Sequence, residues 1–339
     1  MTPHVPVIDI SAYLGGADPA ATAATAAEID QAATTSGFFQ IIGHGIDTAL
    51  LDAVYDGAVR LSHEPPEVKA ALASPSGHPY RGLMSERDSR GIVCSQRFHA
   101  SRFDDAADAA RHGVPEPYAD FFAPNVWPRL PGLRAAVTDL FTETRRLGGE
   151  LMRLFAVALS LPIDYFDPYL APDSSSCSIN YYPARHAPLE SDPTVIFDEH
   201  FDGGTLTILH QRGTYDGLQI RTLDGDWFSV PIIPDAFVIN MGELMTRWTN
   251  DRWPATRHRV IAAADPEGHR TTLTTFHLPA VHTPIAPLAS CGGTEDPHYD
   301  PVTPYEWESR FIKKTYAERR YTVPDPATAG FLAAINQPG

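Results

Sequence analysis

Cysteine, basic charge and long apolar runs are all scarce in this sequence of 339 residues. The three cysteines are far apart and odd in number, which argues against a disulfide framework and favours a reducing, cytoplasmic compartment. Lys and Arg number 26 against 42 Asp and Glu, and the formal net charge of −16 argues against nucleic acid or an anionic membrane as a partner. No apolar run is long enough to span a membrane, and Met1 to Ile8 lack the basic start and apolar core of a signal peptide.

The overall composition is that of an ordinary globular enzyme, with 43% hydrophobic and 20% charged residues. We expect a single catalytic domain over residues 1–339, because no linker-like segment divides the chain. Helical patterns dominate residues 1–170, although residues 74–130 are irregular and rich in Gly, Pro and Arg. Residues 175–285 have the pattern of short strands and turns, and residues 303–321 that of an amphipathic C-terminal helix. This order predicts an α+β fold in which helices flank a jelly-roll core.

Helix starts can be placed from their capping residues. Asp18, which precedes a proline, and Asp47 are both predicted N-caps of helices. A longer helical pattern runs from about Pro131 to Leu161 and contains the pair Gly148-Gly149. No strand precedes this pair, so it indicates close packing or a kink in the helix and not a phosphate-binding loop.

A His-x-Asp pair followed by a distant histidine is the main chemical signal. His200 and Asp202 lie between two strand-like segments, and strand side chains alternate, so we expect both to point to one face. His258 follows 56 residues (258 − 202) after Asp202, within another apolar run. Two imidazoles and one carboxylate, with the other coordination positions open, are the ligand set that suits non-haem Fe(II).

A second His-x-Asp sequence, His298-Tyr299-Asp300, is an internal comparison. Roughly one such pair is expected by chance in a chain with this many His and Asp residues. The second pair lies between two prolines in a loop-like stretch, and no histidine follows it. The first pair has strand patterns on both sides and a further histidine downstream, so the metal is assigned there.

Beyond the third metal ligand, Arg270 and Thr272 repeat the i, i+2 spacing and share one face of a predicted strand. A guanidinium group meets a carboxylate with two parallel hydrogen bonds, and a neighbouring hydroxyl adds a further donor. The pair therefore suits the distal carboxylate of a dicarboxylate cosubstrate, and Arg270 with Thr272 is called the clamp below. Together with the metal ligands, it indicates an oxygenase that depends on Fe(II) and 2-oxoglutarate.

Nine motifs occur in order along nearly the whole chain: Val5-Pro6-Val7-Ile8-Asp9, Ser36-Gly37-Phe38-Phe39, His44-Gly45-Ile46, Asn180-Tyr181-Tyr182-Pro183, Leu206-Thr207-Ile208-Leu209-His210-Gln211, Gly217-Leu218-Gln219, Asn240-Met241-Gly242-Glu243, Arg247-Trp248-Thr249-Asn250 and His258-Arg259-Val260. Together they resemble the isopenicillin N synthase-like family of 2-oxoglutarate- and Fe(II)-dependent dioxygenases. Nine ordered motifs are far more specific than any one of them.

The resemblance implies a distorted double-stranded β-helix in which Fe(II) is held by the three residues assigned above. It also implies that Asn180 and Tyr182 lie near the 2-oxoglutarate bound by Arg270 and Thr272. The implied reaction consumes O2 and 2-oxoglutarate and oxidises an unactivated C–H bond of a small molecule. Hydroxylation, desaturation and ring formation share these motifs. A composition rich in Ala, Pro and Arg favours a role in natural-product biosynthesis.

The substrate pocket is indicated by fewer signals. Phe201 departs from the small or polar residue that this family usually has between its first two ligands. In a regular strand its ring points away from the metal and packs as core, and this is the reading that we favour; a bend at Gly203-Gly204 would instead turn the ring toward substrate. His277 follows the clamp strand and is a candidate substrate contact. Arg81 and Arg97 are candidates for an anionic substrate, and the alternative for each is a solvated side chain.

Two further classes of protein remain open. One is a related iron oxidase that does not use 2-oxoglutarate, or that converts it to ethylene, and the clamp argues against this class. The other is a non-catalytic jelly-roll binding protein, which the intact set of metal ligands disfavours.

Overall fold

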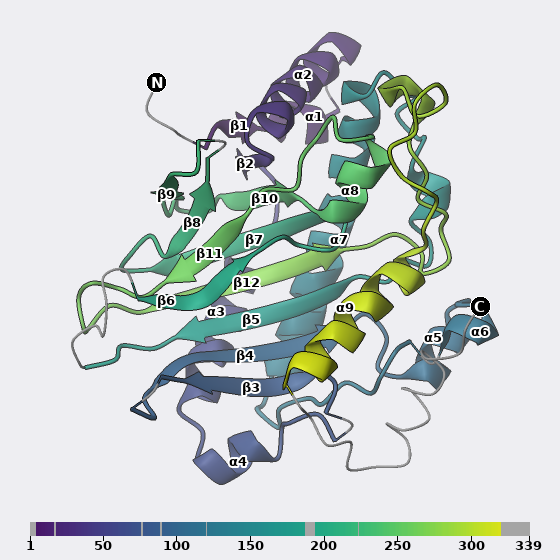
Figure 1. Ribbon diagram of the computed structural model, residues 1–339. Helices are drawn as coiled ribbons and strands as arrows, with labels where there is room; N and C mark the ends of the chain where they lie inside the picture. The colour runs from purple at the N-terminus through teal and green to yellow at the C-terminus, as the bar shows by residue number, and fades with distance from the viewer. Residues whose placement is uncertain are drawn as a thin grey trace.

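The computed structural model describes residues 5–16, 18–75, 77–88, 90–119, 121–186, 194–222 and 224–319. Within them the chain folds into two facing sheets with helices packed around them (Figure 1). The strands are β1 (Val7–Asp9), β2 (Phe38–Ile42), β3 (Gly82–Arg87), β4 (Val93–Ser101), β5 (Ser176–Tyr182), β6 (Val195–His200), β7 (Leu206–Gly213), β8 (Leu218–Arg221), β9 (Trp227–Ser229), β10 (Phe237–Met241), β11 (His258–Ile261) and β12 (Arg270–His277).

Most of the helices alternate with the first four strands along the chain, and of those described only α8 and α9 come after β5. The helices are α1 (Ser11–Leu14), α2 (Pro19–Thr35), α3 (Thr48–Ser62), α4 (Pro66–Ala70), α5 (Ala106–Arg111), α6 (Glu116–Ala119), α7 (Leu133–Ala158), α8 (Glu243–Trp248) and α9 (Pro304–Arg319), with short 3-10 turns at Asp167–Tyr169 and Ala289–Cys291. No helix among these described elements is long and apolar enough to cross a membrane.

The larger sheet has eight strands in the order β1-β2-β10-β7-β12-β5-β4-β3, and the smaller has the order β6-β11-β8-β9. Neighbouring strands are antiparallel except β1 and β2, as a jelly roll requires. The predicted α+β jelly roll is therefore confirmed. Residues 74–130, which have no regular sequence pattern, contribute the antiparallel hairpin β3-β4 at one edge of the larger sheet.

The two faces of the larger sheet have different neighbours. Helices α3 and α7 pack behind it, against β5 and against β12 and β7 (Figure 1). The smaller sheet and α9 lie in front, so the cavity between the sheets is closed on one side by a helix from the C-terminal part of the chain. The range predicted for that helix, 303–321, agrees with α9, except that residues 320 and 321 lie outside the described part of the chain.

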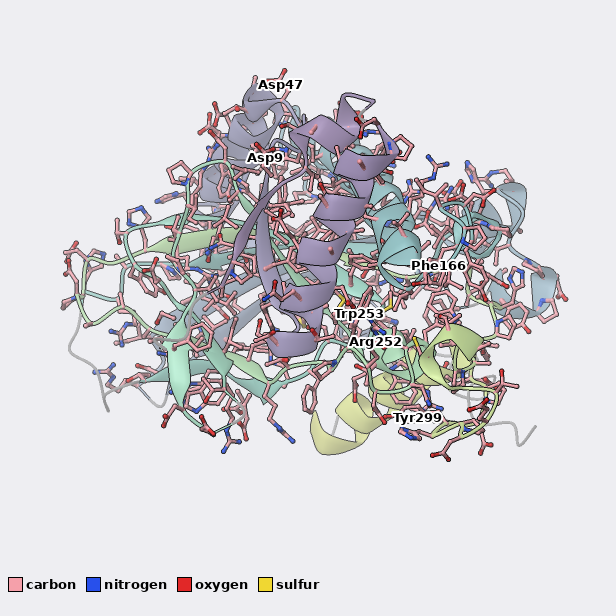
Figure 2. All side chains as sticks on the ribbon, turned by 90° about the horizontal axis from the view of Figure 1, so that it is seen from above. Asp9, Asp47, Phe166, Arg252, Trp253 and Tyr299 are labelled. Carbon is pink, nitrogen blue, oxygen red and sulfur yellow. The ribbon has the colours of Figure 1, made fainter. Side chains whose placement is uncertain are left out.

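Both predicted N-caps are confirmed by hydrogen bonds. The Asp18 carboxylate accepts from the Ala21 backbone N–H, and the Asp47 carboxylate accepts from that of Ala49. Helix α2 is then tied to the loop after α8, because the Trp253 indole donates to Asp30 at 2.8 Å. Figure 2 shows Arg252 and Trp253 together beside this helix.

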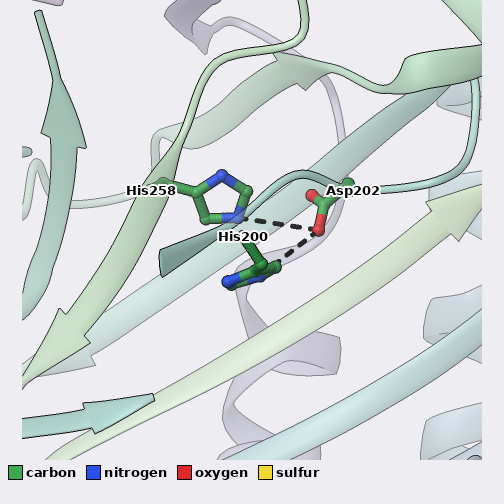
Figure 3. Close-up of side chains that lie close together, drawn as sticks. All are labelled: His200, Asp202 and His258. Carbon is green, nitrogen blue, oxygen red and sulfur yellow. Dashed lines mark ion pairs between the residues drawn. The ribbon is translucent and has the colours of Figure 1, made fainter. Parts of the chain in front are cut away.

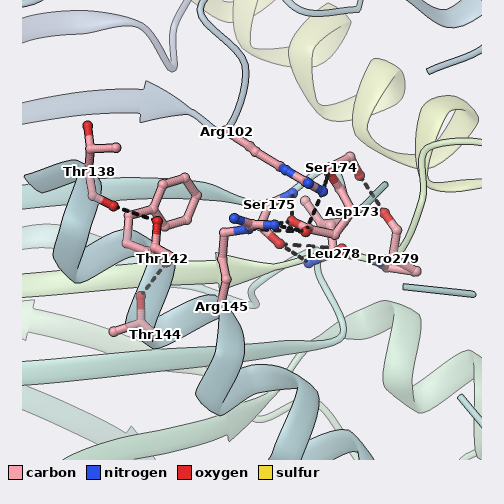
Figure 4. Close-up of polar contacts among 11 residues, drawn as sticks. Arg102, Thr138, Thr142, Thr144, Arg145, Asp173, Ser174, Ser175, Leu278 and Pro279 are labelled. Carbon is pink, nitrogen blue, oxygen red and sulfur yellow. Dashed lines mark hydrogen bonds and ion pairs between the residues drawn. The ribbon is translucent and has the colours of Figure 1, made fainter. Parts of the chain in front are cut away.

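A buried ion-pair cluster connects helix and sheet behind the cavity (Figure 4). The Asp173 carboxylate, on the segment before β5, accepts hydrogen bonds from Arg102, which follows β4, and from Arg145 on α7. Although burial opposes ionisation, the bonds from Arg145 hold the pKa of Asp173 below its usual range. The carboxylate therefore stays charged and fixes three segments that are distant in sequence.

Candidate metal and cosubstrate site

The three predicted metal ligands converge at the open edge between the sheets. His200 is the last residue of β6 and pairs across the strands with His258, the first residue of β11. Asp202 follows on the loop after β6, and its Oδ1 lies 3.6 Å from Nε2 of each histidine (Figure 3). One ligand atom from each residue lies within 4.8 Å of the other two, so the group can hold a metal ion.

Backbone carbonyl groups fix the orientation of both imidazole rings. Nδ1 of His200 lies 2.9 Å from the Asp198 carbonyl oxygen, and Nδ1 of His258 lies 3.0 Å from that of Thr256. A carbonyl oxygen only accepts hydrogen bonds, so each Nδ1 bears the proton. Each Nε2 therefore presents a lone pair toward Asp202, which is the arrangement that a metal-ligating histidine needs.

The Asp202 carboxylate is held by one oxygen only. Its Oδ2 accepts from Thr207 Oγ at 2.6 Å and from Asn240 Nδ2 at 2.9 Å, which leaves Oδ1 directed at the histidines. Thr207 and Asn240 are directly opposite each other on β7 and β10. Local sequence does not reveal this supporting role, although both residues occur in the ordered motifs that carry the family resemblance.

The three groups also shift one another's ionisation. Burial and the neighbouring His258 lower the pKa of His200 to about 4, so this ring is neutral at neutral pH. Although burial opposes both changes, the interaction of Asp202 with His258 holds the pKa of the carboxyl well below its usual range and raises the pKa of that imidazole. With both imidazoles neutral, the Asp202 carboxylate leaves the group with a net negative charge. A metal cation, bound in place of a proton on His258, would balance this charge.

Beside the three ligands lies a buried arginine with unused donors. Arg270 is 1% exposed, and its Nη2 donates to Gln211 Oε1 at 2.8 Å. Its Nε and Nη1 have no hydrogen-bond partner among the described residues. A buried guanidinium group with free N–H donors requires an anion, and a carboxylate fits its fork geometry. The donor set therefore fits 2-oxoglutarate beside a metal.

The other predicted cosubstrate residues surround this arginine. Thr272 is two residues further along β12, and its Oγ accepts from Asn180 Nδ2 at 2.9 Å across the β5–β12 pairing. Tyr182 lies opposite Arg270 in the same register, with the guanidinium carbon 5.4 Å from its ring centre. The structure thus brings all four predicted residues to one end of the cavity.

The cavity itself has a volume of about 230 Å³ and extends from this cluster across the larger sheet. Its floor beyond the clamp is polar, because alternate residues of β4 face it. Arg97, His99 and Ser101 lie opposite Asn180, Ser178 and Ser176 of β5. Arg81, on the segment before β3, also lines the cavity. Both arginines predicted to face a substrate are therefore placed there, and both are largely buried.

The core position that we favour for Phe201 is wrong. β6 ends at His200, so the residues after it do not follow strand alternation. The Phe201 ring is half-buried and lines the cavity, and the Arg257 guanidinium carbon lies 4.7 Å from its centre. The fold instead places Phe201 at the cavity wall beside His200 and Asp202, as the alternative expectation has it.

The expectation that His277 contacts substrate is also not met. Along β12 the residues Thr272, Thr274 and Phe276 face the cavity, so His277 points to the opposite face of the sheet. Its ring packs against Gly148 of α7, and its Nδ1 lies 3.0 Å from Thr205 Oγ. Strand parity counted from the clamp would have predicted this position.

One acidic residue of the cavity was not predicted at all. Glu308 of α9 lines the same space as the metal ligands. Burial, together with the negative charges of Asp202 and Glu243, raises the pKa of Glu308 to about 7. Glu308 could not be predicted from the sequence, because the helix alone does not show which of its residues reaches a cavity formed by distant strands.

Comparisons with known proteins agree with this geometry. The family model of the 2OG-Fe(II) oxygenase superfamily matches residues 174–279, and that of the non-haem dioxygenase N-terminal region, described from morphine synthesis, matches residues 5–130. Isopenicillin N synthase of Streptomyces clavuligerus is 31% identical over 76% of this chain and 80% of its own length. A 2-oxoglutarate-Fe(II) type oxidoreductase of Metarhizium majus is 30% identical, with 91% and 86% covered. Validamycin A dioxygenase of Streptomyces hygroscopicus subsp. limoneus is 28% identical, with 86% and 81% covered.

Solved structures show the same fold over nearly the full chain. A full-length Neurospora crassa protein in complex with alpha-KG and thymine has a TM-score of 0.77 at 23% identity, with 92% of this chain and 97% of that chain covered. JOX2 in complex with 2OG, Fe and JA has a TM-score of 0.70 at 25% identity, with 99% and 90% covered. The chain therefore belongs to the 2OG-Fe(II) oxygenase superfamily and is a non-haem dioxygenase that uses Fe(II), 2-oxoglutarate and O2.

Proposed function

We propose that His200, Asp202 and His258 hold the Fe(II), and that Arg270 and Thr272 bind the far carboxylate of 2-oxoglutarate. Bound Fe(II) supplies the chemistry by which O2 oxidatively decarboxylates 2-oxoglutarate and an unactivated C–H bond of a small molecule is oxidised. The convergence of the three ligand atoms supports the first assignment. Three protein ligands on one side leave the other positions for cosubstrate and oxygen.

The observation that carries the second assignment is the buried guanidinium of Arg270. Two of its nitrogens have no partner among the described residues, so a buried positive charge would be left without an anion if no carboxylate bound there. Gln211 holds one end of the group, and the Asn180 amide holds Thr272 beside it. The residues of the chain thus orient 2-oxoglutarate and exclude water from its far carboxylate.

The substrate belongs on the other side of the metal ligands, where the polar floor of the cavity begins. A relative named for validamycin A, and a structural neighbour that binds thymine, support a polar small molecule of natural-product or intermediary metabolism as the class of substrate. The whole chain is proposed as one catalytic domain, because the N-terminal strands β1 to β4 belong to the same sheet as the clamp strand β12.

The assignments predict different effects on one spectroscopic signal. Under anaerobic conditions, Fe(II) and 2-oxoglutarate should give the wild type a visible charge-transfer band. His258→Ala should abolish the band, because the iron loses a ligand. Arg270→Ala should keep iron but weaken 2-oxoglutarate binding by about 2–5 kcal/mol, because a buried charged contact is lost. Titrations of the band and of bound iron separate the two effects.

Arg259→Ala is the control, since Arg259 lies outside the cavity and bonds Gln219. It should leave both titrations unchanged. A full-strength band in His258→Ala would contradict the metal assignment, and an unchanged 2-oxoglutarate affinity in Arg270→Ala would contradict the clamp. Succinate formed in step with 2-oxoglutarate consumption distinguishes the proposed reaction from an oxidase or an ethylene-forming enzyme.

A further inference from the structure

Glu308 is an acid in the cavity wall to which neither assignment gives a role. It lies on α9, about one turn after Tyr305, and faces the same space as the metal ligands. No hydrogen bond or ion pair to its carboxylate occurs within the described part of the chain. Its charged neighbours Asp202 and Glu243 are themselves acidic. Ionisation of a carboxyl group partly removed from water, with like charges around it, costs free energy, and a cation bound in the cavity would offset that cost.

The cations of the cavity do not serve this purpose, because each is bound elsewhere. Arg97 forms an ion pair with Glu86, and its guanidinium lies over the Phe197 ring. Arg81 donates to the carbonyl oxygens of Ala123 and Tyr80. The remaining cavity arginine, Arg270, is held by Gln211 at the opposite, clamp end. Among the described residues of the cavity no cation is thus left to pair with Glu308, so a ligand is the candidate for the counter-charge.

The surroundings of Glu308 suit an organic cation better than a metal ion. Phe121 lines the cavity and packs against Tyr305 on the same helix, with ring centres 5.9 Å apart, and Tyr80 lines the cavity as well. Aromatic faces beside a carboxylate attract ammonium and guanidinium groups. Among the described residues, Glu308 belongs to no group of three or more side chains that could hold a metal ion.

The floor of the cavity indicates that the rest of the ligand is polar. His99 Nε2 and Ser101 Oγ are buried and have no hydrogen-bond partner among the described residues. Both lie on β4 opposite serines of β5, so four polar side chains line one continuous strip. Unpaired buried polar atoms cost free energy unless a ligand bonds them. An apolar substrate would leave them unsatisfied.

We infer that the substrate of this enzyme carries a basic nitrogen that pairs with Glu308, and polar groups that hydrogen-bond to His99 and Ser101. The inference rests on the proposed function, because it places this substrate in the cavity of the metal ligands. Glu308 determines specificity: it orients the amine end of the molecule and thereby selects which C–H bond faces the metal. It takes no part in the bond changes themselves.

Charge-matched probes test the inference without turnover. L-threonine, L-phenylalanine, D-glucosamine and cadaverine are each compared with their fully N-acetylated forms, which lack the positive charge. The N,N-dimethyl forms keep the charge and add bulk, and so control for size. Each probe is titrated at millimolar concentration into the anaerobic enzyme with Fe(II) and 2-oxoglutarate, and the shift of the visible band reports occupancy beside the metal.

Free amines and their dimethyl forms should shift the band at concentrations roughly tenfold or more below those that the acetylated forms require. Loss of a buried charge pair lowers binding affinity by at least that factor. Glu308→Gln should abolish this preference. Glu295→Gln, which changes an exposed glutamate ahead of the same helix, should keep it. Melting temperatures of both variants show whether they are folded. The comparison of amines with acetylated forms on the wild-type enzyme does not depend on either variant.

Three results would overturn the inference. They are equal or tighter binding of the acetylated forms, absence of any shift with every amine while the band itself is intact, and a folded Glu308→Gln enzyme that still prefers amines. Tighter binding of acetylated forms would mean that Glu308 is protonated and donates a hydrogen bond to a neutral ligand. Absence of the band in the wild type would instead contradict the proposed function, so the two failures are distinguishable.

Discussion

At the scale of single residues, the site is defined by atoms that have no hydrogen-bond partner within the described part of the chain. Nδ1 of His200 and Nδ1 of His258 each donate a hydrogen bond to a backbone carbonyl oxygen, and Asp202 Oδ2 accepts from neighbouring side chains. The Nε2 atom of each histidine and Oδ1 of Asp202 therefore remain available for a cation. Likewise, two nitrogens of Arg270 have no partner among the residues that the structure describes and can take a carboxylate. Pre-oriented donors of this kind bind without reorganisation, which is the usual contribution of a protein to metal-dependent chemistry.

Phe201 allows a test at this scale. Its ring is half-buried at the cavity wall, so Phe201→Ala should lower stability by only about 1 kcal/mol, mainly through lost contact with Arg257. Removal of the ring should also admit water beside the metal ligands and raise succinate formation in the absence of substrate. Thermal unfolding and a succinate assay measure the two effects.

Val195→Ala is a matched control for Phe201→Ala, because Val195 lies on the strand that leads to Phe201 and is 38% exposed. It should change neither quantity. A loss of about 3–5 kcal/mol in Phe201→Ala, as expected for a fully buried aromatic residue, would restore the core position that alternation predicts.

At the scale of elements, the packing of helix α7 decides what each glycine of its Gly148-Gly149 pair does. Gly148 and Gly149 are adjacent in this helix, but they face different surroundings. A Cβ atom at Gly148 would lie 2.5 Å from Cδ2 of His277, which is buried in the sheet, whereas one at Gly149 would meet nothing within 4 Å. The close packing predicted from the pair is thus confirmed for Gly148 alone.

The two glycines therefore respond oppositely to alanine. Gly149→Ala should stabilise the protein by about 0.5–1 kcal/mol, because alanine loses less backbone entropy in a helix. Gly148→Ala should destabilise it, since overpacking typically costs about 1–3 kcal/mol and exceeds that gain. Chemical denaturation of both variants measures the difference. Equal stabilisation by both would show that the His277 ring can move away from the helix.

At the scale of the whole molecule, Asp173 joins parts of the chain that local patterns do not connect. It lies before β5, and its partners Arg102 and Arg145 lie after β4 and on α7. The cluster fixes the end of the polar strip formed by β4 and β5, next to the helix that supports the sheet from behind (Figure 4). The geometry of the cavity floor thus depends on a cluster outside the cavity.

Loss of this carboxylate should be costly and should depend on pH. Asp173→Asn leaves two arginine charges without their anion and should destabilise the fold by about 3–5 kcal/mol at neutral pH. The folded pKa of Asp173 is lowered, so its contribution is fully present above the unfolded pKa and is lost as the pH falls toward the folded value. The deficit of the variant should therefore shrink below about pH 4.

Asp139→Asn, at an exposed position on α7, is the control and should change stability little. Denaturant unfolding of both variants at neutral and acidic pH measures the free energies. A deficit of Asp173→Asn that is constant with pH would show that the carboxylate contributes through packing and not through charge.

The sequence by itself determined the chemistry and the local structure of this protein. Ligand spacing and strand patterns predicted His200, Asp202 and His258 as a group, and the i, i+2 spacing predicted Arg270 with Thr272 beside them, and the fold brings these residues together. Local capping rules identified the starts of two helices. These signals are visible in sequence because they depend on neighbouring residues: strand parity, helix caps and motif order all act within a few positions.

Only the tertiary structure decided which side chains line the cavity. The end of β6 at His200 placed Phe201 at the cavity wall, and parity along β12 placed His277 behind the sheet. The packing of α9 across the cavity brought Glu308 to metal ligands that lie 50 or more positions earlier in the chain (308 − 258). These placements depend on where elements end and how they cross, and such long-range packing overrides local pattern.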